Sequence, residues 1–135
     1  MKSNKLTSLL VLGLLMVLSV SSCEKKKTLD CKVTGRWVVM PSTLYEFTAD
    51  SLQYTIYSAN GNGAFGSIAD AIPNPHSWYM DGDTIVIDLN FGNVSKQYVQ
   101  FSCDCNVMTW TSDQFQGTPY TAYLWKEGHD TATCK

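Results

Sequence analysis

The sequence contains few of the residues and none of the motifs on which most catalytic sites depend. It has only two histidines, His76 and His129, and neither lies in a recognisable nucleophile setting. The Gly-x-Ser-x-Gly, His-Glu-x-x-His and glycine-rich phosphate-binding motifs are absent. These absences indicate that the protein is not an enzyme, and no motif suggests a cofactor.

A long apolar run is also absent. Leu9 to Leu18 is apolar apart from Gly13, which is too short for a transmembrane helix of roughly 20 residues. It follows the positively charged start at residues 1–5 and precedes Val20-Ser21-Ser22-Cys23, which is the layout of a bacterial lipoprotein signal. We therefore expect cleavage before Cys23 and acyl chains on its sulfur. The alternative is an ordinary secretory signal beside a cysteine.

An excess of basic residues is missing as well. Without residues 1–22 the chain keeps 113 residues, with 8 basic and 12 acidic side chains and a formal charge of −4. A nucleic-acid-binding domain would present a basic face, so nucleic acid is not an expected partner. The run Lys25 to Lys27 lies beside the expected lipid anchor, where it either contacts anionic headgroups or forms a solvated tether.

The length of the mature chain allows one domain with a hydrophobic core, but not two. We expect a signal peptide at 1–22, a tether at 23–34, a folded domain at 35–127 and a tail at 128–135 that is stapled by Cys134. The expected partner is the lipid bilayer, through acylated Cys23. Glu24 is not a clear inner-membrane retention signal, so the expected location is the outer membrane, facing the periplasm.

Four cysteines remain after lipidation: Cys31, Cys103, Cys105 and Cys134. An even number in an exported chain favours two disulfides. Alternatively, three of them, Cys103, Cys105 and Cys134, could bind zinc or copper together with His129, although their spacing is not that of a zinc motif. A one-residue gap makes Cys103 and Cys105 poor disulfide partners for each other, so each should bond to Cys31 or Cys134.

Short alternating runs rich in β-branched and aromatic residues predict an all-β fold, because no stretch has a helical period. We expect eight strands, over residues 35–40, 43–48, 52–57, 76–80, 84–89, 95–102, 106–111 and 120–126. Short links such as the Asp81-Gly82 hairpin imply sequential antiparallel neighbours. The exception is the link over 58–75, whose apolar residues 64–72 suggest a short helical turn packed on the domain.

Eight such strands predict an antiparallel up-and-down barrel, which leaves no exposed sheet edge. Alternation places one apolar set inside the barrel: Leu52, Tyr54, Ile56, Ile85, Ile87, Leu89, Val99 and Phe101. The same topology collects all four cysteines at one end. At the other end Phe65, Phe91 and Phe115 could rim an opening, or they could cap a filled core. These three residues, with Tyr54 and Trp78, are the candidate ligand-binding residues.

Three motifs resemble the lipocalins, and more closely the small bacterial lipocalin-like lipoproteins. They are Gly35-Arg36-Trp37 in the first strand, Tyr45-Glu46-Phe47 in the second and Trp78 to Asp83 in a hairpin. The resemblance covers residues 31–127. It implies a barrel closed at one end by Trp37 beneath a basic side chain from the last strand, here Lys126. The chain is shorter than full-length lipocalins and has no long helix after the last strand.

Two functions follow from these features. The first is a membrane-anchored barrel that binds a small apolar or amphipathic ligand at the aromatic opening. The second is an envelope protein-protein interaction module, an inhibitor or an accessory subunit, with a filled barrel and no ligand cavity. In that case the long link over 58–75 would dock the partner protein.

Overall fold

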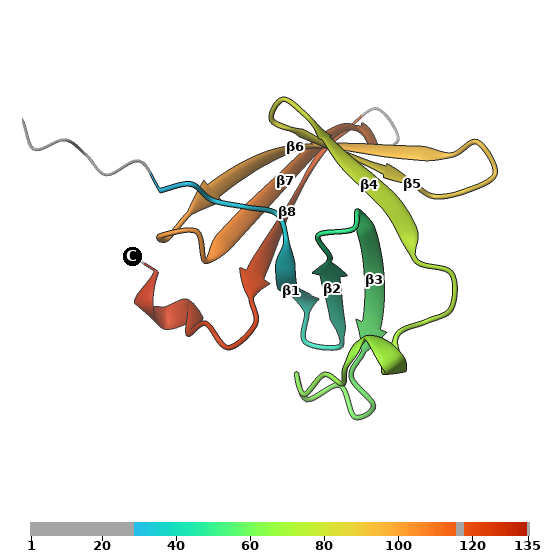
Figure 1. Cartoon of the computed structure of the whole chain (residues 1–135). Helices are drawn as coiled ribbons and strands as arrows, with labels where there is room; N and C mark the ends of the chain where they lie inside the picture. Colours follow the sequence, from blue (N-terminus) through green and yellow to red (C-terminus); the bar gives the residue numbers. More distant parts are fainter. Residues whose placement is uncertain (1–28, 116–117, 135) are drawn as a thin grey trace, which may run out of the picture.

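The computed structural model describes residues 29–115 and 118–134, except for the side chains of 113–115. The predictions for residues 1–28, including lipidation of Cys23, concern residues outside this range. The chain forms a closed antiparallel barrel in which neighbours in sequence are neighbours in space. Figure 1 shows its strands: β1 (Gly35–Met40), β2 (Thr43–Phe47), β3 (Leu52–Tyr57), β4 (His76–Asp81), β5 (Thr84–Asp88), β6 (Val94–Ser102), β7 (Val107–Phe115) and β8 (Thr118–Lys126). The predicted fold class is confirmed.

The largest difference from the predicted strands is the β7–β8 hairpin. The two strands reach Phe115 and Thr118, where a link over 112–119 was expected. The register shifts between Ser112 and Phe115, and this irregularity lets the pairing continue. Pro119 is tolerated in β8 because β1 pairs with β8 only at Trp125 and Lys126, which leaves the edge beside Pro119 without a ladder partner in β1.

The half of the barrel interior that lies nearer the disulfides is filled by large apolar side chains. Side chains from five strands are almost completely buried: Trp37, Phe47, Ile85, Met108 and Leu124. Trp37 contacts Phe101 with ring centroids 6.0 Å apart, and Phe47 meets Trp110 edge to face at 6.0 Å. Among the described residues, this packing fills the space along the barrel axis at this end.

In β3 the predicted set of inward-facing residues is wrong, because the alternate residues face the interior. Tyr45 and Phe47 pack in the core, and their cross-strand partners Thr55 and Gln53 therefore face inward with them. Leu52, Tyr54 and Ile56 face outward instead. Ile56 is nevertheless fully buried, because the segment between β3 and β4 covers this wall. Leu89, also expected inside, lies just after β5 and is exposed.

The covering segment contains the predicted helical turn, the 3-10 helix η1 (Ile68–Asp70). Ser67 and Asp70 form a capping box around it. The Ile72 N–H donates to the Thr55 carbonyl at 2.9 Å, which fixes the segment to β3. Figure 1 shows the segment beneath β2 and β3, so it lies against the barrel wall, while most of its residues remain exposed.

Arg36 ties the same wall to the end of β8. Its guanidinium donates to Glu46 at 2.6 Å, to Glu127 at 2.5 Å and to the Gly66 carbonyl at 2.7 Å. The hydrogen bond to Glu127 is the main cause that raises the pKa of Arg36. One side chain on β1 therefore links β2, the long segment and the residue after β8.

The barrel has two narrow seams. β3 and β4 are paired only through Leu52↔Ser77 and Gln53↔His76, and β1 and β8 only through two residue pairs. Figure 1 shows the result as two groups of strands, β1 to β3 and β4 to β8. Because β4 continues beyond the first residue of β3, the β4–β5 hairpin extends past the group formed by β1 to β3.

Both predicted disulfides form. Cys31 bonds to Cys105 and Cys103 to Cys134, which decides the pairing that the sequence left open. Three consecutive residues of the β6–β7 turn, Cys103 to Cys105, have φ of 53°, 52° and 67°, in the left-handed region. After β8 the chain forms η2 (Thr131–Thr133) and returns to this turn. Neither 3-10 helix in the described part is long or apolar enough to cross a membrane.

The two bridges yield a stability prediction. Replacing Cys31 and Cys105 with alanine should lower the free energy of unfolding by about 4 kcal/mol, because the bridge closes a loop across 74 residues. The bridge between Cys103 and Cys134 joins residues that are 31 apart in sequence. Replacing both with alanine should lower the free energy of unfolding by about 3.5 kcal/mol. Urea unfolding followed by tryptophan fluorescence measures both. A loss below about 1 kcal/mol for the first pair would contradict the prediction.

Candidate functional site

The barrel end that holds the disulfides is crossed by the segment before β1. The Trp37 indole N–H donates to the Val33 carbonyl at 2.7 Å, and the Val33 side chain is buried in the core. Cys31 holds the segment to the β6–β7 turn. Residues 31–34, expected as part of a tether, therefore belong to the folded domain.

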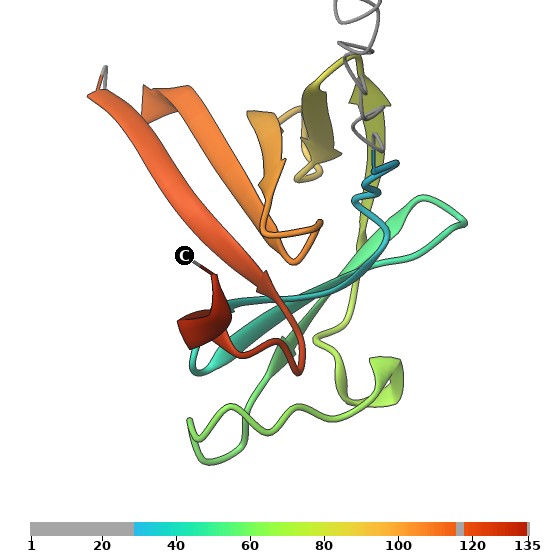
Figure 2. The ribbon, with the colours of Figure 1, turned by 90° about the vertical axis from the view of Figure 1, so that its left-hand side faces the viewer.

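A groove of about 680 Å³ lies between this crossing segment and the β4–β5 hairpin. We call it the stapled-end groove. One wall consists of residues 29–34, and the other contains Trp78, Met80, Gly82 and Asp83. Val99 and Phe101 of β6 complete the lining. Figure 2 shows residues 29–34, in blue, running beside β4, in olive.

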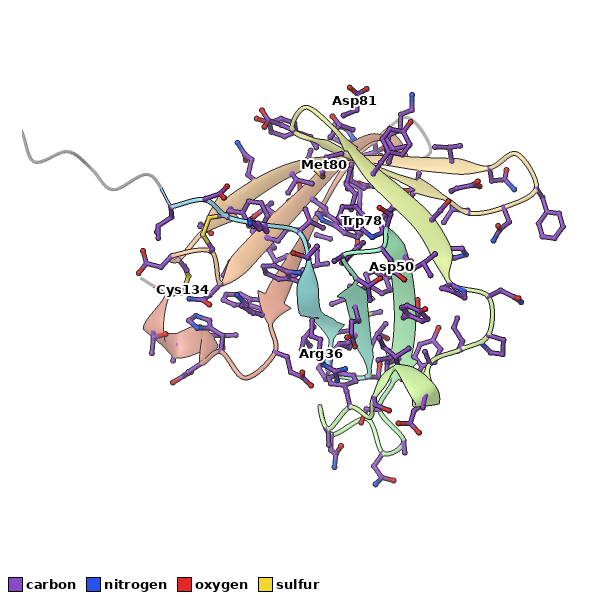
Figure 3. All side chains as sticks on the ribbon, viewed as in Figure 1. Arg36, Asp50, Trp78, Met80, Asp81 and Cys134 are labelled. Atoms are coloured by element: carbon purple, nitrogen blue, oxygen red, sulfur yellow. A yellow bond between two sulfur atoms is a disulfide. The ribbon has the colours of Figure 1, made fainter. Side chains whose placement is uncertain are left out.

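The floor of the stapled-end groove is apolar and rigidly held. Trp78 meets Phe47 edge to face with centroids 5.4 Å apart, so the same side chain belongs to the core and to the groove. Its indole N–H donates to the Leu52 carbonyl at 3.2 Å. In Figure 3 Trp78 points from β4 toward the barrel interior, with Met80 further along the strand. The floor can therefore contact an apolar chain without first becoming ordered.

The rim of the groove carries charge. Lys32 lies 3.8 Å from Asp30 in an exposed ion pair, and Asp83 stands in the hairpin on the opposite side. An apolar floor beneath a polar rim suits an amphipathic molecule. The two acids outnumber the lysine, so the rim favours a neutral head over an anionic one.

The hairpin that forms the second wall depends on Gly82. This residue has φ of +58° in the two-residue link between Asp81 and Thr84, a conformation that glycine adopts without steric cost. The sequence prediction of a tight Asp81-Gly82 turn is confirmed.

The structure does not form the expected aromatic opening. Phe91, with φ of +56°, is fully exposed at the tip of the β5–β6 link. Phe65 lies in the segment that packs outside β1 to β3, where its neighbour Gly66 binds Arg36. Figures 1 and 2 place these two segments well apart. The side chain of Phe115 lies outside the described residues.

Of the other two candidate ligand residues, only Trp78 lines the stapled-end groove. Tyr54 faces outward, opposite Glu46 on β2. Trp37 and Lys126, the expected closing pair, are cross-strand partners between β1 and β8. Trp37 is fully buried, and Lys126 is exposed.

A second, smaller gap of about 350 Å³ lies at the opposite end, between the start of β6 and the β7–β8 hairpin. Its lining includes the polar residues Ser95, Gln97 and Ser112 and the apolar residues Leu89 and Val94. Nearby in the barrel, Tyr45 stacks on Trp110 at 5.9 Å, and burial raises the pKa of Tyr45. Among the described residues, the Gln97 Oε1 and Trp110 Nε1 atoms are buried without a hydrogen-bond partner.

Sequence reasoning missed the groove because it assigned residues 23–34 to a tether. Two signals could have found it. The predicted strand order already placed Cys31, the β4–β5 turn and the β6–β7 turn at the same end of the barrel. Val33 is the one apolar residue between Cys31 and Gly35. A disulfide at Cys31 holds this segment against the domain, so the sequence could have predicted that Val33 is buried.

Within residues 29–115 and 118–134, no three histidine, cysteine or acidic side chains gather as a metal site. The three cysteines of the alternative metal site, Cys103, Cys105 and Cys134, are all in disulfides. Searches of protein-family models, curated proteins and solved structures gave no match to the chain.

Proposed function

We propose that this protein is a lipid-anchored envelope barrel that binds a small amphipathic molecule in the stapled-end groove. The observation that carries the proposal is the groove of about 680 Å³, with Trp78, Val99 and Phe101 beneath a charged rim. This volume lies within the range of about 300 to 1,000 Å³ that small-molecule sites occupy. The proposal moves the binding site from the end opposite the disulfides to the end that contains them.

Because the barrel interior near the disulfides is filled, we expect the ligand to lie across the end of the barrel rather than along its axis. Trp37, Phe47 and Met108 occupy the space in which a deep hydrophobic cavity would have to form. The apolar part of the ligand would then rest on Trp78 and Phe101, with its polar part at the rim. This arrangement differs from the deep cavity that the lipocalin resemblance would imply.

The expected anchor supports the same site. Five residues, 24–28, separate the lipidation candidate Cys23 from Leu29, which borders the groove. Such a length of chain spans at most about 20 Å, so the groove would lie close to the bilayer that supplies amphipathic molecules. The lipoprotein signal and the Gly-x-Trp start favour a relative of the small bacterial lipocalin-like lipoproteins, in the outer membrane and facing the periplasm.

Charging one wall of the groove should weaken binding. Met80→Glu should reduce the affinity for the neutral dye Nile red at least about tenfold, because a carboxylate beside an apolar ligand must lose its hydration. Tyr79→Glu is the matched control. Tyr79 is the adjacent residue, is 60% exposed and pairs with Val86 on the outer face, whereas Met80 is 39% exposed and lines the groove.

Fluorescence titration of the purified domain measures both affinities. Circular dichroism of each variant verifies that the barrel is intact. Unchanged binding by Met80→Glu, or an equal loss in both variants, would place the site elsewhere.

Lipidation has its own test. Bacteria that express the full chain and grow with an alkyne-labelled fatty acid should incorporate the label into this protein, because the thiol of Cys23 is the expected acceptor. Cys23→Ser should abolish the labelling, while Ser22→Ala should retain it. Labelling that persists in Cys23→Ser would show that the acyl chain is carried elsewhere, and absence of label in the unaltered chain would favour ordinary secretion.

A further inference from the structure

The edge of β4 leaves two backbone groups without a partner beside the stapled-end groove. A two-residue turn makes Asp81 and Thr84 a hydrogen-bonded pair, and the ladder then alternates along the hairpin. Tyr79 therefore bonds to Val86, while Trp78 and Met80 direct their N–H and C=O groups away from β5. The Trp78 N–H confirms this alternation, because it donates to the Ser51 carbonyl at 3.0 Å on the β3 side.

Met80 lies beyond the reach of β3. The β3–β4 ladder ends with Leu52↔Ser77, and Met80 is three residues further along β4. Among the described residues, no backbone group on that side bonds to the Met80 N–H or C=O. Both groups therefore remain available on the edge that borders the groove, where Met80 itself is part of the lining.

We infer that the ligand of this groove is an N-acylated amino acid, whose acyl chain lies on the apolar floor and whose amide groups pair with Met80. The inference rests on the proposed function and names the chemical class of its ligand. In an antiparallel pair, one residue both donates to and accepts from the residue opposite. A single amino acid that is acylated at its nitrogen has the same two groups, an amide N–H and a carbonyl on either side of one carbon.

A plain fatty acid or alcohol does not pair with both the N–H and the C=O of Met80. Neither has an amide N–H together with a carbonyl at the spacing of one residue. The rim adds a second selection, because Asp30 and Asp83 outnumber Lys32. A neutral derivative, in which the carboxyl is an amide, therefore fits better than a free carboxylate.

The ligand class is tested with a pair of compounds that differ in one group. Dodecanoyl-glycinamide has the N–H that donates to the Met80 carbonyl, and dodecanoyl-sarcosinamide has a methyl group in its place. The first should displace Nile red from the unaltered protein at a concentration about fivefold lower, the ratio that one hydrogen bond of about 1 kcal/mol gives. Dodecan-1-ol, with the same chain and no amide, should resemble the sarcosine compound or bind more weakly.

Hydrogen exchange at one backbone amide gives an independent readout. The Met80 amide proton should exchange at least about fivefold more slowly with bound dodecanoyl-glycinamide than with bound dodecan-1-ol, because only the former has an N–H that holds its carbonyl opposite the Met80 N–H. The Tyr79 amide, which already bonds to β5, serves as the internal control and should not change. No substitution is needed, so a folding defect cannot confuse the result.

The outcomes separate the two proposals. If all three compounds displace the dye equally and Met80 exchange is unaffected, the ligand class is overturned while binding in the groove stands. If none of them displaces the dye and the dye itself binds equally to Met80→Glu and the unaltered protein, the proposed function fails as well. A fivefold preference for the glycine compound supports the inference.

Discussion

The structure depends on one turn, Cys103 to Cys105, to which both ends of the described chain are bonded. Cys105 holds the segment before β1, and Cys103 holds the tail after β8. Because β1 and β8 share only two residue pairs, the ladder alone joins the first and last strands weakly. The bridges restrict the separation of these strands in the unfolded chain as well as in the barrel. The groove depends on the same constraint, since Cys31 positions one of its walls.

The groove also depends on the different extents of β3 and β4, because β4 continues beyond the point where β3 begins. β3 begins at Leu52, opposite Ser77, and the preceding Ser51, with φ of +66°, belongs to the turn that joins β2 to β3. β4 continues for four residues past this pair and has β5 as its only ladder partner there. An exposed edge is usually an aggregation risk, which proteins limit by keeping it short and charged. Here the edge is short, it ends at Asp81, and residues 29–34 lie beside it.

The sequence was sufficient for the strands and their order, since alternation, turn residues and short links define them without reference to the far side of the sheet. It was not sufficient for the orientation of β3. Leu52, Tyr54 and Ile56 alternate as inward residues would, but the long segment covers their face, and Gln53 can face inward because it bonds to Thr55 at 3.0 Å and lies 3.3 Å from His76. Alternation shows that one face is buried and does not show which. The aromatic opening failed for a related reason, because Phe65 belongs to the cover of the outer wall.

The groove could be located only once this packing was known. Trp78 contacts Phe47 in the core and also lines the groove, so the barrel interior fixes the position of the site from beneath. The crossing segment is fixed from the same side, through Trp37 and Val33. A ligand therefore meets two walls that are already ordered, and its binding does not have to offset the entropy of arranging them. Beside the groove, the Met80 N–H and C=O have no backbone partner among the described residues, and for that reason the chemistry of the ligand is inferred from the strand edge rather than from any side chain.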